Sequence, residues 1–395
     1  MSRPGARLAD LVRPGMRIAL GDGLGSPRSV SPELSAAAAA AGGVRLLLGW
    51  TPVLDPGLDL TAFADVRTVM SGWGLRSAVD AGLVRAVPVR LGAVPALLHG
   101  PLRPDLLVAS VVVRPDGGFA FGTEISWMRA AVDAGARIAA VLSRRLPCCD
   151  AGPRLPEDRI VVVAETDDPP TTLTFTTPGE EHRAIAEHIA DLVPSGARLQ
   201  VGPGALGAAV LDALRRPVRI DSGLLPDGVP SLERRGLLVG EPVASYLAGS
   251  AGLLEWADGR PVLHRLEHTH DLTRLSTGTP FVAVNTALEI DEQAQVNVEG
   301  LPGSAVGGIG GHPDYAAAAA RSVGGLSIVA LPSRHRGRAT LVSRLSLPVS
   351  TPGHDVDVLV TEAGAVDLRG LDRTERARAV AALWEAAPVA AGTRS

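Results

Sequence analysis

Short, continuous runs of apolar residues, many of them β-branched, alternate along this chain with alanine-rich runs of helical character. Unbroken apolar runs of this length between helices are typical of parallel strands that are buried on both faces. The predicted strands include residues 44–48, 106–113, 138–142 and 160–164. The predicted helices include residues 32–41, 125–134 and 181–192. The pattern therefore indicates an α/β fold with largely parallel sheets.

The pattern is interrupted once, by a stretch rich in Asp, Pro and Thr at residues 166–179. Proline-rich stretches of this kind favour a linker. A helix is expected to open at Glu180 and Glu181, and a second α/β pattern starts near Arg198. For a chain of 395 residues two domains are expected. We predict an N-terminal domain at 1–179 and a C-terminal domain at 180–395.

The composition excludes several chemistries. The chain contains no lysine, so all 38 of its basic residues are arginine. A lysine Schiff base with pyridoxal phosphate and a P-loop lysine are therefore impossible. The net charge is −4 with mixed signs, which disfavours nucleic-acid binding. No apolar run approaches 18 residues, so a cytoplasmic protein without a membrane segment is expected.

Two glycine-containing segments in the C-terminal half carry a family resemblance. The first is Gly-Ile-Gly-Gly-His-Pro-Asp-Tyr at 308–315, and the second is Gly-Gly-Leu-Ser-Ile-Val-Ala-Leu-Pro-Ser at 324–333. With weaker segments in the same order elsewhere in the chain, they resemble the acetyl-CoA hydrolase/transferase family, which includes the 4-hydroxybutyrate CoA-transferases. Those weaker segments are residues 72–76, 116–122, 199–205, 281–291, 358–364 and 369–387.

The resemblance implies a CoA-transferase fold, with the ligand in a cleft between the two domains. It implies an acyl-CoA substrate, a small carboxylic acid as a second partner and a homodimer. The residues expected to contact coenzyme A are Gly308, Ile309, Gly310, Gly311, Gly202 and Gly204. Backbone without side chains can approach an anionic arm closely and offer N–H donors. The alternative for residues 308–311 is a tight structural turn.

One position departs from the family pattern. Members use a glutamate nucleophile in a His-Thr-Glu-x-x-x-Asp-Gly stretch, and the corresponding run here is Asp-Ser-Gly-Leu-Leu-Pro-Asp-Gly at 221–228. The nucleophile position is therefore Gly223. A second departure places Val-Leu-Ser at 141–143, where members carry Glu-Val-Asn. We expect the substrate pocket to include Ser222, Gly223, Leu224 and Ser143.

Three residues are candidates for the missing chemistry. Asp221 would face the same way as Gly223 in an ideal strand and serve as a general base, whereas Ser222 would face away. The alternative role of Asp221 is to pair with an arginine. His312 is either an acid/base group or a cap of the following helix. Cys148, beside Cys149, is either a thiolate nucleophile or a small buried apolar residue.

The run Glu-His-Thr-His-Asp at 267–271 lacks a second pair with zinc spacing, so a solvated loop is favoured and no metal is expected. The leading hypothesis is an acyl-CoA enzyme with altered chemistry, either thioester hydrolysis or acyl transfer without a glutamyl-CoA intermediate. The alternatives are a CoA-transferase with a relocated nucleophile and a non-catalytic subunit that binds coenzyme A. Apolar residues at Leu224, Leu225 and Leu146 would suit an acyl group larger than acetyl.

Overall fold

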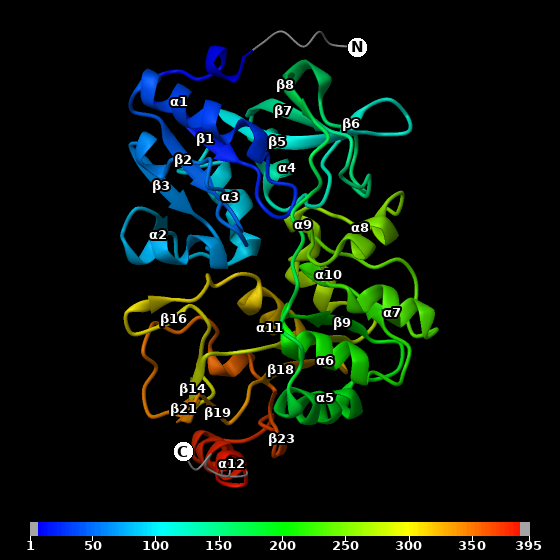
Figure 1. Cartoon of the computed structure of the whole chain (residues 1–395). Coiled ribbons are helices and arrows are strands. Elements are labelled where there is room, and N and C mark those ends of the chain that lie inside the picture. Colours follow the sequence, from blue (N-terminus) through cyan, green and yellow to red (C-terminus); the bar gives the residue numbers. More distant parts are fainter. Residues whose placement is uncertain (1–6, 388–395) are drawn as a thin grey trace, which may run out of the picture.

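The computed structural model describes residues 7–387, which form two α/β halves stacked one above the other in Figure 1. The first half contains a parallel sheet of N-terminal strands, and the second contains a mostly parallel sheet of C-terminal strands. The α/β fold with largely parallel sheets is therefore confirmed. Residues 1–6 and 388–395, the outer ends of the two predicted domains, lie outside the described residues.

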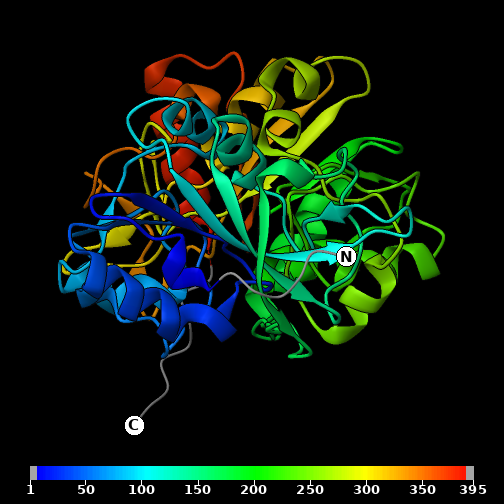
Figure 2. The ribbon, with the colours of Figure 1, turned by 90° about the horizontal axis from the view of Figure 1, so that it is seen from above.

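The first sheet has the strand order β4-β3-β2-β1-β5-β7-β8, and each of these strands runs parallel to its neighbours. Its strands are β1 (Arg17–Leu20), β2 (Arg45–Leu48), β3 (Asp65–Thr68), β4 (Arg85–Ala86), β5 (Leu106–Val113), β7 (Arg137–Ser143) and β8 (Ile160–Thr166). β6 (Phe119–Ala120) pairs with β5 in the antiparallel direction. Viewed from above, the strands fan out across the sheet (Figure 2).

Helices cover both faces of this sheet. They are α1 (Ser31–Ala41), α2 (Arg76–Asp80), α3 (Val94–Leu98) and α4 (Met128–Asp133). Leu106 and Val108 of β5 join an apolar cluster with α1, whereas Leu107 and Ala109 join another cluster with α4. Successive side chains of a strand point to opposite faces, and every buried position of β5 except Ser110 is apolar, as a strand covered on both faces requires.

The predicted helix at 125–134 begins later than expected, at Met128. Ser126 has a left-handed backbone with φ of +45°, and its hydroxyl is hydrogen-bonded to the hydroxyl of Tyr246. A residue in the left-handed region cannot belong to a right-handed helix. The contact with a residue far along the chain therefore decides where α4 starts.

The second sheet has the order β10-β9-β13-β18-β22-β23, and only β23 is antiparallel to its neighbour. Its strands are β9 (Arg198–Val201), β10 (Arg219–Ile220), β13 (Phe281–Asn285), β18 (Leu326–Ala330), β22 (Val358–Thr361) and β23 (Gly364–Asp367). The helices of this half are α5 (Glu180–Leu192), α6 (Ala205–Ala213), α7 (Gly228–Arg234), α8 (Ala251–Ala257), α9 (Leu266–Thr269), α10 (Leu272–Ser276), α11 (His312–Arg321) and α12 (Arg373–Glu385).

Several two- and three-residue strands lie outside the second sheet. They are β11 (Leu224–Leu225), β12 (Tyr246–Leu247), β14 (Glu289–Asp291), β15 (Val296–Asn297), β16 (Gly300–Leu301), β17 (Ser304–Ala305), β19 (Arg334–His335), β20 (Arg338–Ala339) and β21 (Leu341–Val342). The pair β11–β12 matters for the site because it aligns Leu224 with Tyr246.

Backbone hydrogen bonds join the two halves. The amide of Leu91 donates to the carbonyl of Gly310 at 2.9 Å, and the amide of Ile125 donates to the carbonyl of Ser245 at 3.0 Å. The largest apolar cluster contains residues from both sheets, among them Leu107 and Leu199. The halves therefore share a core, and the space between them is a fixed junction.

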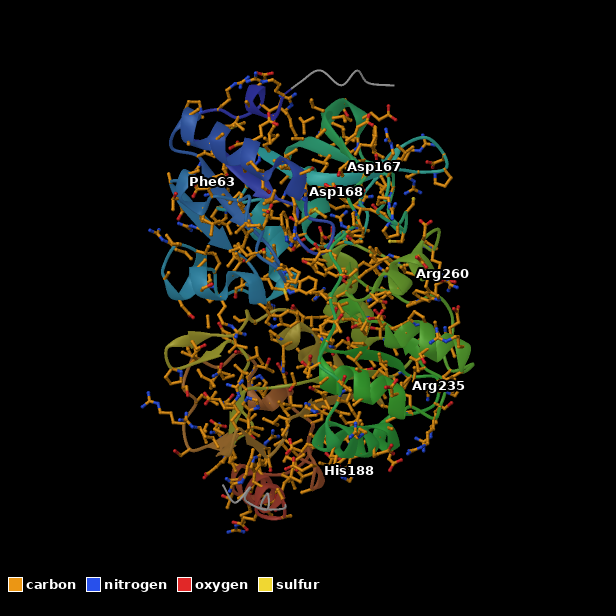
Figure 3. The ribbon with its side chains drawn as sticks, in the orientation of Figure 1. Phe63, Asp167, Asp168, His188, Arg235 and Arg260 are labelled. Carbon is orange, nitrogen blue, oxygen red and sulfur yellow. The ribbon has the colours of Figure 1, made fainter. Side chains whose placement is uncertain are left out.

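The predicted linker has no helix or strand at residues 167–179. Within it, the amide of Thr171 donates to the carbonyl of Leu24, and the amide of Leu173 donates to the carbonyl of Gly249, each at 3.0 Å. Figure 3 labels Asp167 and Asp168 in the upper half of the view, Arg260 near mid-height at the right edge, and Arg235 below it. Among residues 7–387, no helix is long and apolar enough to cross a membrane.

Candidate active site

A cavity of about 380 Å³ lies between the two halves. Trp50, Met70, Trp73 and Leu91 line it from the first half. In the second half, the cavity lies at the carboxyl ends of β9 and β13. These two strands are neighbours, and the chain continues from β9 to β10 on one side and from β13 to β18 on the other side. Such switch points are where open α/β sheets bind ligands, since the crossing connections diverge there and leave a crevice.

One end of this cavity is a wall of aromatic side chains. The ring of Trp50 meets that of Tyr246 edge to face, with ring centres 5.4 Å apart. Trp50 meets Trp73 in the same way at 6.3 Å. Met70 and Leu224 pack beside them. This end offers a ligand apolar surface with fixed ring orientations.

The other end contains buried polar atoms that have no hydrogen-bond partner among the described residues. These atoms are Nε2 of His270, Nε2 of His312, Oη of Tyr315, Oε1 of Gln200 and Nδ2 of Asn285. All five residues line the cavity. Buried polar groups are nearly always hydrogen-bonded, so five unpartnered atoms around one cavity indicate a place where a polar ligand group binds.

His270 lies at the junction between α9 and α10. Its Nδ1 is 2.9 Å from the hydroxyl of Thr269, which is in turn 2.6 Å from the hydroxyl of Ser245. Burial lowers the pKa of His270 to about 3, and the positive charge of Arg274 adds to this shift. The ring is therefore neutral at pH 7, and its orientation is held from the Nδ1 side.

His312 is the first residue of α11, and the structure brings this predicted residue to the cavity. Its Nδ1 is 2.7 Å from the hydroxyl of Thr351. Burial lowers the pKa of His312 to about 4, while the backbone carbonyl of Thr286 opposes the shift by favouring a proton on the ring. His312 is thus a second neutral imidazole with a free Nε2 at the cavity.

The glycine loop at 308–311, predicted to contact coenzyme A, also lines this cavity. Gly310 has φ of +63°, a conformation that side chains disfavour. A Cβ atom at Gly311 would lie 2.5 Å from Nε2 of His270 and 2.9 Å from the ring of Tyr315. The absence of a side chain at Gly311 therefore lets the loop pass directly over His270.

Gly223 faces the same polar end. A Cβ atom here would lie 3.1 Å from Oη of Tyr315 and 3.6 Å from Cε1 of His270. Any side chain at position 223 would therefore begin beside the unpartnered atoms of these two residues. Ser222, Gly223 and Leu224 all line the cavity, as does Gly202.

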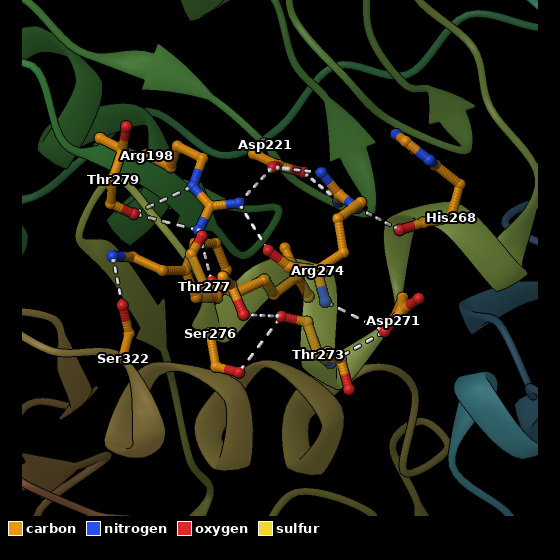
Figure 4. Close-up of polar contacts among 12 residues, drawn as sticks. Arg198, Asp221, His268, Asp271, Thr273, Arg274, Ser276, Thr277, Thr279 and Ser322 are labelled. Carbon is orange, nitrogen blue, oxygen red and sulfur yellow. Dashed lines mark hydrogen bonds and ion pairs between the residues drawn. The ribbon is translucent and has the colours of Figure 1, made fainter.

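Asp221 is directed elsewhere, into a buried network of arginines (Figure 4). Its two carboxylate oxygens accept hydrogen bonds from Arg274 at 2.7 and 2.8 Å, and Arg198 lies 3.7 Å away. Asp221 is not among the described residues that line the cavity. This geometry matches the alternative role, in which Asp221 is an arginine partner.

The expectation that Asp221 and Gly223 share one face assumed a continuous strand. The structure instead has two short strands, β10 and β11, separated by residues 221–223. Ser222, which an ideal strand would turn away but which was also predicted as a pocket residue, lies at the cavity lining, and its hydroxyl donates to the carbonyl of Val201. An interrupted strand does not keep the two-residue alternation on which the prediction depended.

The remaining predicted residues lie outside this cavity. The amide of Cys148 bonds to Asp258, the thiol of Cys149 bonds to the carbonyl of Gly122, and burial raises the pKa of both thiols. A raised pKa disfavours the reactive thiolate. Ser143 lines a separate cavity of about 150 Å³ with Leu146. Gly204 lines another cavity, of about 300 Å³, beside α6.

A buried acidic pair beneath the aromatic wall was missed by the sequence analysis. Oδ2 of Asp22 accepts from the hydroxyl of Tyr246 at 2.7 Å and from the amide of Trp50 at 2.8 Å. Burial raises the pKa of Asp22 to about 6. Burial and the nearby charge of Asp22 raise the pKa of Glu124 to about 8. Nothing in the spacing of Asp22 and Glu124 pointed to this arrangement.

His270 and the aromatic residues were also missed as site residues. His270 falls within the run considered as a possible metal cluster, and Trp73 and Tyr315 fall within segments that carried the family resemblance. Across residues 7–387, no group of three or more His, Cys, Asp and Glu side chains is arranged to hold a metal ion.

Comparison with known proteins agrees with this geometry. Residues 249–387 match the family described as the acetyl-CoA hydrolase/transferase C-terminal domain. The 4-hydroxybutyrate coenzyme A transferase of Clostridium kluyveri is 27% identical over 77% of this chain and 75% of its own length. An acetyl-CoA hydrolase of Kluyveromyces lactis is 28% identical over 56% of this chain and 46% of its own length.

The fold is also found in a solved structure, that of RipA from Yersinia pestis. The two superpose with a TM-score of 0.84 at 24% identity, over 95% of this chain and 94% of the other. Residues 249–387 therefore resemble an acetyl-CoA hydrolase/transferase C-terminal domain, and the chain is similar in sequence to CoA-transferases and acetyl-CoA hydrolases.

Proposed function

We propose that this protein binds acyl-CoA thioesters in the cavity between its halves and hydrolyses them without a glutamyl-CoA intermediate. The observation that carries the proposal is the surroundings of Gly223. This residue has no side chain to act as a nucleophile, and its backbone faces unpartnered polar atoms of His270 and Tyr315. The space beside it suits a thioester carbonyl and a water molecule.

His270 and Tyr315 are proposed to bind the carbonyl oxygen of the thioester. At pH 7 both groups are neutral, because burial lowers the pKa of His270 to about 3 and raises that of Tyr315 well above its usual value. A neutral imidazole whose Nδ1 accepts a hydrogen bond from the hydroxyl of Thr269 carries its proton on Nε2 and can donate from there. Two fixed donors in a dry cavity stabilise the negative charge that develops on this oxygen during attack.

His312 is proposed to take the proton from water. Thr351 can accept a hydrogen bond from Nδ1, which leaves the lone pair of Nε2 directed to the cavity. The water oxygen attacks the carbonyl carbon while its proton passes to Nε2. The tetrahedral intermediate then loses the carbon–sulfur bond, and the departing thiolate takes the proton from His312. The products are a carboxylic acid and free coenzyme A.

The glycine loop at 308–311 is proposed to lie along the arm of coenzyme A. Three of the four residues of this loop are glycines, so its backbone can expose amides to a ligand at the cavity. Relatives named as CoA-transferases and acetyl-CoA hydrolases support this choice of substrate.

The test follows free thiol from acyl-CoA in the absence of any acceptor acid. His312→Gln should reduce the rate on the order of 100-fold or more, as expected when a general base is lost. His268→Gln is the matched control, because His268 stacks on His264 and is not among the described residues at the cavity. Mass spectrometry of the protein during turnover should find no covalent coenzyme A adduct.

Two results would overturn the proposal. Thiol release that requires an added carboxylic acid would favour CoA transfer, the activity in the name of the Clostridium relative. Saturable binding of coenzyme A without turnover of any thioester would favour a binding subunit.

A further inference from the structure

Four of the twelve aromatic side chains of this chain line the cavity. Aromatic residues make up only 3% of the sequence, with five tryptophans and two tyrosines. Two of those tryptophans and both tyrosines line the cavity. Rings that line a cavity, in contrast to Trp127, Phe121 and Phe281, which are fully buried and do not line it, offer apolar surface to a ligand.

The rings of this aromatic wall stand nearly perpendicular to one another. Interplanar angles are 82° between Trp50 and Tyr246, 74° between Trp50 and Trp73, and 78° between Trp73 and Phe175. Perpendicular rings present both faces and edges to a guest, so a further aromatic ring can make edge-to-face contacts with more than one of them.

Buried hydrogen bonds hold this wall in place. A single carboxylate oxygen of Asp22 accepts from the Tyr246 hydroxyl, from the Trp50 amide and from Nε1 of Trp127. The two inner rings therefore keep their positions without a ligand. A site that is already arranged loses little conformational entropy on binding, so its apolar surface converts efficiently into affinity.

Trp73 forms the outer part of the wall. Its side chain is 43% exposed, although it is one of the largest apolar groups of the chain. It packs on Phe175 of the segment between the two halves. An exposed tryptophan that continues a buried aromatic surface extends the apolar site towards solvent.

The wall lies directly beside the proposed reaction centre. Leu224 belongs to the aromatic cluster, and its neighbour Gly223 faces His270 and Tyr315. One residue of extended chain spans about 3.3 Å, which is the distance from a carbonyl carbon to the second or third carbon of an acyl group. A thioester bound at Gly223 thus has the wall within reach of its acyl side.

Taking the proposed thioester hydrolysis as its basis, we propose that the acyl group is aromatic, as in an arylacetyl thioester, and that Trp50, Trp73 and Tyr246 select it. A ring at this position covers apolar surface that an acetyl group leaves in contact with water. Each buried methylene-sized group contributes about fourfold, so burying half of a six-carbon ring favours phenylacetyl-CoA over acetyl-CoA by roughly 60-fold.

The test measures kcat/KM for phenylacetyl-CoA and acetyl-CoA, with calorimetric Kd values for both thioesters as a second readout. The wild type should prefer phenylacetyl-CoA by roughly 60-fold. Trp73→Ala should reduce this preference about tenfold by removing one ring of the wall. Trp256→Ala is the matched control, because Trp256 packs on Arg260 and bonds to Glu233 away from the cavity, and it should leave the preference unchanged.

The two proposals fail in different ways. Equal kcat/KM and equal Kd for the two thioesters would overturn the aromatic selectivity while leaving hydrolysis in place. An absence of turnover with both thioesters would overturn hydrolysis, and the ratio of the two Kd values, with its response to Trp73→Ala, would then decide the selectivity by itself. A preference that Trp256→Ala reduces as much as Trp73→Ala would also refute the assignment.

Discussion

Asp221→Ala tests whether this carboxylate is structural or catalytic. The substitution removes both acceptors of the bidentate bonds from Arg274 and the nearby charge that faces Arg198. Removing one partner of a buried ion pair costs about 3–5 kcal/mol, because the other charge stays buried without compensation. We therefore expect a large loss of stability and little loss of turnover per folded molecule.

The expected shift in melting temperature follows from chain length. Unfolding entropy is about 2.1 cal/mol/K per residue, which gives roughly 0.8 kcal/mol/K for 395 residues. A loss of about 4 kcal/mol then lowers the melting temperature by about 5 °C. Glu187→Ala is the matched control, since Glu187 pairs with Arg215 at the surface and such pairs contribute about 1 kcal/mol or less.

The assay combines differential scanning calorimetry with thiol release, measured well below the melting temperature of every variant. An Asp221→Ala protein that melts like the wild type but no longer releases thiol would refute the structural role. That result would identify Asp221 as a group acting in the reaction despite its position outside the cavity lining.

Three further perturbations test the buried groups. Chemical denaturation should show Glu124→Gln gaining stability relative to the wild type as pH rises from 5 to 8, by on the order of 4 kcal/mol. The reason is that folded Glu124 keeps its proton to about pH 8, whereas the unfolded chain loses it near pH 4.5. A stability difference that does not change with pH would contradict a buried carboxylic acid. His270→Gln should lose less stability than the wild type as pH falls below 6.5, since the unfolded imidazole gains its proton there and the folded one gains it only near pH 3. An equal loss of stability with falling pH in both proteins would contradict a buried neutral ring. Gly311→Ala should cost about 1–3 kcal/mol by forcing His270 aside, whereas Gly307→Ala, whose Cβ would meet nothing within 4 Å, should cost far less; similar melting temperatures for the two variants would show that the ring yields freely.

The fold was predictable because local runs of apolar residues mark the buried strands of this chain. The run at 106–113 is apolar except at Ser110, and both faces of β5 are in fact covered. The glycine loop at 308–311 was predicted from the family resemblance to contact coenzyme A. The structure places it at the cavity, where Gly311 passes close to His270 and Tyr315, and its contact with coenzyme A stays a prediction. The absence of lysine already removed whole classes of chemistry.

The orientation of residues 221–223 was not predictable in this way. Their side-chain directions depend on a break between β10 and β11 and on the position of Arg274, which captures Asp221 from another element. The start of α4 was misplaced for a similar reason, because Ser126 is held by Tyr246 from the other half. The homodimer stays a prediction.

The amino-acid sequence by itself therefore determined the layers and the parallel sheets, because these follow from the local pattern of apolar positions. Only the tertiary structure decided which side chains meet at the cavity. Trp50 and Tyr246 form one wall, and His270 and His312 lie at one polar end, although each pair is distant in sequence. The physical reason is that a site is made by backbone turns and long-range contacts, which a periodic pattern does not encode.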